Sequence, residues 1–171
     1  MPASDPLLND LLKPEAALSE VVRPIQRPRH DALQNLLTLW QQRPADGFVI
    51  GRDIPSRAFA PLLSHILVWQ PQDDCRDLTL HLCGEALRLR FGDDAVGKRF
   101  SELVAPEVTP YFVAIGAKML HQDFCACFDM HLTRKQPIEG RATLHFELMI
   151  FPLWSPHRQA RWILNALAYF L

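Results

Sequence analysis

The sequence predicts an α+β domain in which helices pack against one face of a five-stranded antiparallel sheet. Three segments near the C-terminus, 124–134, 142–153 and 160–171, have the periodicity of strands. The first two alternate apolar and polar residues, as half-buried strands do, and the third is apolar on both faces, as a central strand is. Two earlier strand-like segments, 66–70 and 76–84, are separated from these three by short helical segments. Strands that bury one face against helices give a two-layer domain.

Composition sets the class of protein. A chain of 171 residues with 49% hydrophobic and 22% charged residues is long enough for one domain with a packed core. The net charge is −1, and no block of like charges occurs, which argues against nucleic acid as a partner. No run approaches the roughly 18 apolar residues that cross a bilayer, and the N-terminus lacks the basic start of a signal peptide. We therefore expect a cytoplasmic protein with no membrane contact.

The chain divides at residue 30. Residues 1–29 carry five of the 14 prolines and little periodicity, so we predict a proline-rich leader. Residues 30–171 form the predicted domain, which begins with an amphipathic helix over 30–43. Its apolar stripe contains Leu33, Leu36, Leu37 and Trp40. Such a stripe needs a cover, either the outer sheet face of its own subunit or that of a second copy across a two-fold axis. We favour a homodimer through this helix, because isologous contacts are the commonest.

The middle of the chain is predicted from spacing and turn residues. In segment 76–84, Leu78, Leu80 and Leu82 alternate with polar positions, which indicates one apolar face. Residues 85–91 fit one or two helical turns closed by Gly92, and 93–107 fit a turn and a short helix capped by Ser101. Segment 109–122 then places four apolar residues on one helical face: Phe112, Ile115, Met119 and Leu120.

This order of elements resembles the PAS superfamily, and in detail its compact stand-alone bacterial members. The matching pieces are LLTLWQQR, IPSRAFAPLLSHILVWQ, LTLHLCGEALRLRFG, VGKRFSELVAPE and RWILNALAYFL, and the resemblance spans about residues 33–170. It implies a five-stranded antiparallel sheet with short helices inserted between the second and third strands. It also implies a non-enzymatic sensory domain that binds a small molecule or a protein and signals through a separate effector. Asn165 departs from the pattern, because a small residue is usual at that position.

The apolar faces converge between the sheet and the helices, where the PAS fold holds either a filled core or a ligand cavity. The sequence leaves both open, because protein interiors normally pack to near-crystal density. Polar residues on the inserted elements, Arg88, Arg90 and Arg99, are suited to an anionic ligand or to solvent. Our candidates for the pocket are Leu80, Leu82, Phe112, Ile115, Met119, Ala126, Phe128, Phe146 and Asn165.

Enzymatic signatures are missing from the sequence. It has no GxxxxGK[ST] or GxGxxG loop, no HExxH, no CxxC and no GxSxG, and nothing matches the NCRFLQ stretch of photochemical flavin PAS domains. The acids Asp129 and Glu147 fall on the polar alternation, away from the expected cavity. We therefore predict no enzyme. The alternatives are an interaction-only dimerisation module with a filled core, or a cone-like α+β enzyme, which a one-residue register error would favour.

Two sets of residues are of the types that bind a metal ion or haem, but we predict neither site. Cys125, Cys127 and His131 share one side of a strand, and His145 joins them if the next strand pairs as a hairpin, which would form a Cys₂His₂ set. Haem-binding PAS domains use a histidine on the helix that here ends near His121, but the position of this residue in the last turn favours a helix C-cap. The cofactor stays unknown. We expect all four cysteines to be free thiols, because a core of this size needs no disulfides.

Overall fold

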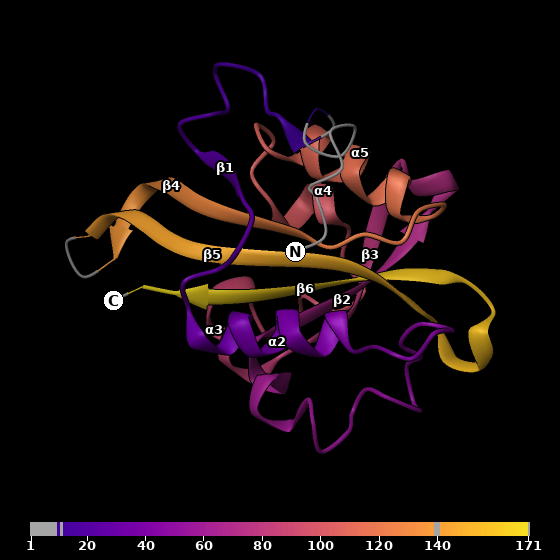
Figure 1. Cartoon of the computed structure of the whole chain (residues 1–171). Helices are drawn as coiled ribbons and strands as arrows, with labels where there is room; N and C mark the ends of the chain where they lie inside the picture. Colours follow the sequence, from indigo (N-terminus) through magenta and orange to yellow (C-terminus); the bar gives the residue numbers. More distant parts are fainter. Residues whose placement is uncertain (1–9, 11, 139–140, 171) are drawn as a thin grey trace.

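A six-stranded antiparallel sheet forms the centre of the molecule (Figure 1). This computed structural model describes residues 10, 12–138 and 141–170, without the side chains of 133–142. The strand order is β1-β4-β5-β6-β2-β3. The strands are β1 (Val22–Ile25), β2 (Ile66–Gln72), β3 (Asp77–Cys83), β4 (Ala126–Ile138), β5 (Arg141–Trp154) and β6 (Arg161–Tyr169).

The five predicted strands are β2 to β6, and the predicted helices lie between β3 and β4. These are α3 (Glu85–Phe91), α4 (Phe100–Leu103) and α5 (Thr109–Met119), and a 3₁₀ helix, η1 (Ala60–His65), precedes β2. Gly92 ends α3 with φ of 93°, as expected. Arg99 rather than Ser101 precedes α4, and the Ser101 hydroxyl donates to Asp77 instead. The arrangement is α+β, with one strand more than the sequence indicates.

The additional strand comes from the segment that we expected to be a leader. In β1, Val22 pairs with Met130 and Pro24 with Phe128 of β4. Val22 is fully buried. A proline is tolerated here because β1 is an edge strand, where its missing N–H leaves no bond of the sheet interior unmade. The packed part of the chain thus begins before residue 30, and the predicted boundary is wrong.

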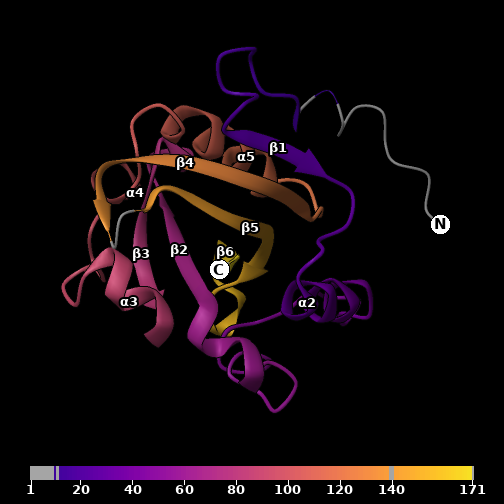
Figure 2. The same ribbon diagram turned by 90° about the vertical axis from the view of Figure 1, so that its left-hand side faces the viewer.

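Both faces of the sheet are covered (Figures 1 and 2). The inner face packs against α3, α4 and α5, where Leu87, Phe100 and Ile115 are buried with the inward side chains of the strands. The outer face packs against α2 (Asp31–Gln41) and the chain that follows it. In the described part of the chain, no helix is long and apolar enough to cross a membrane.

A β-bulge changes the faces of β3. Val68 pairs with Leu82 and Trp69 with Leu80, so His81 has no partner opposite it on β2. An extra residue in one strand moves every later side chain to the other face. Leu82 therefore packs with the outer-face cluster and Cys83 with the inner one. The prediction that Leu82 lines an inner pocket is wrong for this reason.

The helix α2 lies within the predicted range 30–43, and its stripe is covered by the sheet of the same chain. His30, not Asp31, is its N-cap and accepts from the Ala32 N–H at 3.2 Å through Nδ1. Leu33, Leu36 and Trp40 are buried, and the ring centroids of Trp40 and Phe151 lie 4.9 Å apart.

Truncation of this stripe tests how much the helix contributes to the fold. Leu36 is fully buried, so Leu36→Ala should lower the free energy of unfolding by about 2–5 kcal/mol. Asn35→Ala on the exposed side of the same turn is the control and should change it by no more than about 0.5 kcal/mol. Urea unfolding followed by circular dichroism measures both. Equal midpoints for the two variants would contradict the docking of α2.

Candidate functional site

A cavity of about 310 Å³ lies between the inner face of the sheet and the inserted helices. Its wall on the sheet side comes from four strands, with Leu67, Trp69, Met130, Leu132, Leu144, Phe146, Leu148, Asn165, Leu167 and Tyr169. The wall on the helix side runs from the end of α3 to the start of α5, with Leu89, Arg90, Phe91, Phe100, Leu103, Val104, Ala105, Val108 and Phe112. Volume and lining are typical of a site for a small, mostly apolar molecule.

The mouth of the cavity is formed by the end of α3. Leu89 is 94% exposed, which is unusual for a leucine beside an apolar cavity. The Arg90 guanidinium lies over the Tyr169 ring, 3.7 Å from its centroid, and both residues line the cavity. A cation therefore stands at the entrance to an apolar space.

Asn165 supplies a polar group inside the cavity and is 8% exposed. With its amide oriented to satisfy both ends, the oxygen accepts from Trp69 Nε1 at 3.3 Å and the nitrogen donates to the Leu164 carbonyl at 3.3 Å. An amide has two N–H donors and two lone pairs, so one of each remains for a ligand. The departure from the PAS pattern at this position thus lies in the cavity wall.

The predicted pocket residues divide into three groups. Phe112, Phe146 and Asn165 line the cavity. Leu82 lies on the other face of the sheet, as described above. The remaining five are buried in the inner core without lining the cavity: Leu80, Ile115, Met119, Ala126 and Phe128. Around Phe128 the space is filled, since the Phe112 and Tyr111 rings contact it edge-on at 5.4 and 5.9 Å.

Most of the helix side of the cavity is not apparent from the sequence. Leu89, Leu103, Val104 and Val108 belong to short helices and turns, which carry no long periodic pattern. Of the three arginines that we considered, Arg90 alone lines the cavity. Arg88 instead pairs with Glu85 at 3.5 Å, and Arg99 precedes α4. The exposed apolar residue Leu89, between two arginines, was a usable signal.

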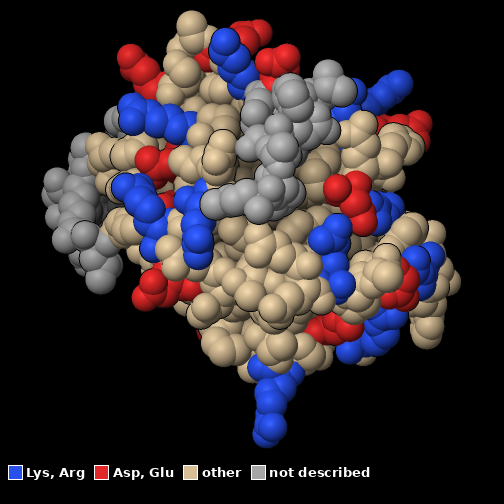
Figure 3. Space-filling model, viewed as in Figure 1, with Lys and Arg blue, Asp and Glu red and all other residues tan. Residues whose placement is uncertain are grey.

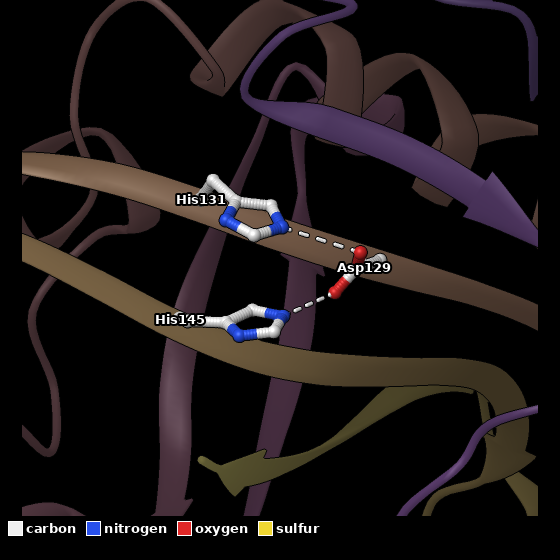
Figure 4. A group of neighbouring side chains, drawn as sticks. All are labelled: Asp129, His131 and His145. Carbon is white, nitrogen blue, oxygen red and sulfur yellow. Dashed lines mark hydrogen bonds and ion pairs between the residues drawn. The ribbon is translucent and has the colours of Figure 1, made fainter. Parts of the chain in front are cut away.

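A second group of polar side chains lies on the outer face of β4 and β5. His131 pairs directly with His145, and Asp129 with Glu147, in the sheet register. The two imidazole rings stack at 4.1 Å, and both Nε2 atoms point to Asp129, at 2.6 Å from His145 and 3.2 Å from His131 (Figure 4). Burial pushes the pKa of Asp129 up, but hydrogen bonds and charge from the two histidines outweigh this and hold it below its usual value.

Glu147 beside this group is fully buried and binds the start of α2. Its carboxylate accepts from the backbone N–H of Arg29 at 2.9 and 3.0 Å, from Arg29 Nε at 3.0 Å and from the His30 N–H at 2.9 Å. The hydrogen bond to Glu147 and the charge of Asp129 raise the pKa of the exposed Arg29 side chain. Asp129 and Glu147 both face away from the cavity, as the strand parity predicts.

The other candidates for metal or haem are not brought together. Cys125 and Cys127 pack with the outer core, and the compact group of metal-ligating atoms in the described residues contains Asp129 rather than either thiol. His121 is exposed just beyond α5, where its backbone N–H donates to the Lys118 carbonyl. It does not line the cavity, so its position suits a helix end and not a haem ligand.

Surface charge shows no strong patch on the face in Figure 3, where acidic and basic side chains are interspersed.

Comparison with known proteins leaves the family open. No family model matches, and no curated protein does. Thirteen chains of solved structures match. One, a light-oxygen-voltage domain studied with a flavin analogue, is 17% identical over 67% of this chain and 82% of its own, with a TM-score of 0.43. A likeness at this level carries no conclusion about ligand or activity.

The cysteines are free in the structure, as predicted. Burial, with a smaller effect from Asp77, raises the pKa of the Cys75 thiol to about 11. Loss of hydration, together with the neighbouring Cys127, raises that of Cys125. Because the thiolate is the reactive form, the folded protein should react slowly with a thiol reagent at pH 8, and four thiols should react after unfolding. Titration with and without denaturant measures this, and two or zero thiols in the unfolded, unreduced protein would contradict it.

The cavity itself can be tested by filling it. Leu148 lines the cavity, so Leu148→Phe has room and should change the free energy of unfolding by less than about 1 kcal/mol. Ala126 is buried beside Ile150 on the same face but away from the cavity. Ala126→Phe should therefore overpack the core and cost about 1–3 kcal/mol. Comparable losses in both variants would mean that the cavity is filled in solution.

Proposed function

We propose that this chain is a non-enzymatic sensory domain of the PAS type that binds a small, largely apolar molecule and signals through a separate effector protein. The observation that carries the proposal is the cavity of about 310 Å³ between the sheet and the inserted helices. Protein interiors normally contain few voids larger than a water molecule. A space of this size with an apolar wall is expected to be occupied when the protein works.

The lining also indicates the chemistry of the ligand. The deep part near Phe146 and Leu148 accepts a hydrocarbon or aromatic body, and the amide of Asn165 can bind one polar group on it. Arg90 at the mouth favours an anionic end that stays partly in water. A medium-chain or aromatic carboxylate has this combination of groups.

The described residues that line the cavity include no acid, histidine, cysteine or serine. General acid–base or nucleophilic chemistry mostly uses such a group within reach of the bound molecule. Tyr169 also lines the cavity and could in principle take that role, but its ring lies under the Arg90 guanidinium. This supports a binding domain over the cone-like enzyme. The size of the cavity supports it over an interaction module with a filled core.

We propose in addition that the protein is cytoplasmic and that it forms a homodimer. The stripe of α2 packs on its own sheet, so a dimer through this helix requires either its remaining exposed side or an exchange of helices between copies.

Paired probes test the ligand chemistry. Decanoate and decanol share an apolar chain and differ in charge, so each should raise the melting temperature of the full chain. At a hundredfold excess over Kd the gain is about 2.7 kcal/mol, or roughly 5–11 °C for a domain of this size. Arg90→Ala should reduce the shift with decanoate and leave the shift with decanol. Arg88→Ala is the matched control and should change neither.

The same protein, purified from its own host, should carry a bound small molecule in native mass spectra. If native mass spectra show no bound small molecule and neither probe raises the melting temperature, the filled-core interaction module is the better interpretation.

A further inference from the structure

The polar group on the outer face has the composition of a metal site. Asp129, His131 and His145 each offer one ligand atom, and these atoms lie within 4.8 Å of one another. Two imidazoles and one carboxylate form a set that binds Zn²⁺ and other first-row divalent ions, with open positions left for water or a further ligand. Chelating carboxylates alone are common on surfaces, but two histidines that converge on one carboxylate are not explained by solubility.

The strands hold these side chains in place. Asp129 and His131 are two residues apart on β4, so they point to the same side of the sheet. His145 lies directly opposite His131 on β5. Neighbouring ligands in a tetrahedral zinc site lie about 3.3 Å apart, given Zn–N distances of 2.0–2.1 Å. The Nε2 atoms of His145 and His131 now lie 2.6 and 3.2 Å from the Asp129 oxygens, close to this spacing, and their side chains are 31% and 34% exposed, which leaves room for them to rotate.

Arg29 now supplies the positive charge at this site. Its Nη2 lies 3.2 Å from Asp129 Oδ1 and 3.5 Å from His145 Nε2, on the side to which both imidazoles point. The Arg29 side chain is 62% exposed, and its backbone N–H and Nε bind Glu147 instead. Because the guanidinium is a rigid plane, moving Nη2 away also breaks the Nε bond to Glu147, but the backbone N–H groups of Arg29 and His30 keep that carboxylate bound. Glu147 has no free role as a ligand, because its oxygens accept from Arg29 and His30.

We propose that Asp129, His131 and His145 bind a divalent transition metal ion of the Zn²⁺ type, and that Arg29 Nη2 occupies the site in the metal-free chain. The metal takes the carboxylate oxygen and both Nε2 atoms, and the guanidinium is displaced toward solvent. The proposal uses no residue of the cavity, so it stands or falls independently of the proposed ligand.

Titration of the full chain with Co²⁺, whose visible spectrum reports its ligands, tests this. We expect one ion per chain, with the spectrum of nitrogen and oxygen ligation, displaced by Zn²⁺. His131→Gln and His145→Gln should each weaken Co²⁺ binding. Each loss should exceed the roughly 10–100-fold that follows when a residue supporting a metal ligand is replaced. His121→Gln, an exposed histidine elsewhere, is the control and should bind as the native chain does.

Arg29→Met should change the Co²⁺ affinity in the opposite direction. This variant keeps the test valid if a histidine variant fails to fold. Removal of the competing charge should tighten Co²⁺ binding roughly fivefold, which is within the range of an exposed ion pair. Circular dichroism confirms that each variant is folded. A thiolate-to-cobalt charge-transfer band, histidine variants with native affinity, or no saturation at millimolar Co²⁺ would each overturn the proposal.

Discussion

The buried carboxylate of Glu147 is the interaction on which the two-sided packing of the sheet depends. A fully buried charge is strongly unfavourable unless it is paired and hydrogen-bonded, and within the described residues its partners come from Arg29 and His30. Those partners are the residues directly before α2, so the carboxylate also faces the positive end of the helix dipole. The chain can leave edge strand β1, cross to the outer face and start a helix because one side chain of β5 satisfies its backbone donors there.

The position of α2 explains how the sheet can leave space on its inner face. With Leu36 and Trp40 seated on the outer face, residues such as Met149 and Phe151 are fully buried on that side. The inner core is filled around Phe128, and the cavity lies toward α3, α4 and the start of α5. The helices α3 and α4 have seven and four residues, too few to be stable without tertiary contacts. The cavity thus lies at the part of the fold where a bound molecule adds the most packing.

Periodicity predicted the elements that depend on local pattern. It failed where contacts between distant segments determine the structure of a segment or the face on which its side chains lie. Alternation located β4 and β5, the continuous apolar run located β6, and the i, i+3, i+4 stripe located α2. The bulge at His81 leaves no mark in the sequence, so Leu82 was assigned to the wrong face. The prolines of β1 suggested a leader, because an edge strand is recognised only once its partner is known. For the proposed metal site, the alternation of side chains along one strand already places Asp129 on the same face as His131, whereas we considered the cysteines of that face as ligands instead.

One strand joins the two proposed sites. Along β5, Phe146 and Leu148 line the cavity on the inner face, while His145 and Glu147 alternate with them on the outer face. A shift of β5 that accommodates a ligand therefore moves the carboxylate that holds the start of α2 and one histidine of the metal group. Adjacency shows a physical connection and not yet an energetic one, which requires an element with two arrangements that both sites bias. If the proposed metal site is correct, the segment from Arg29 to α2 is such an element, since Arg29 Nη2 leaves the Asp129 group when the metal binds. If ligand and metal act on it, linkage requires that each change the affinity of the other by the same factor.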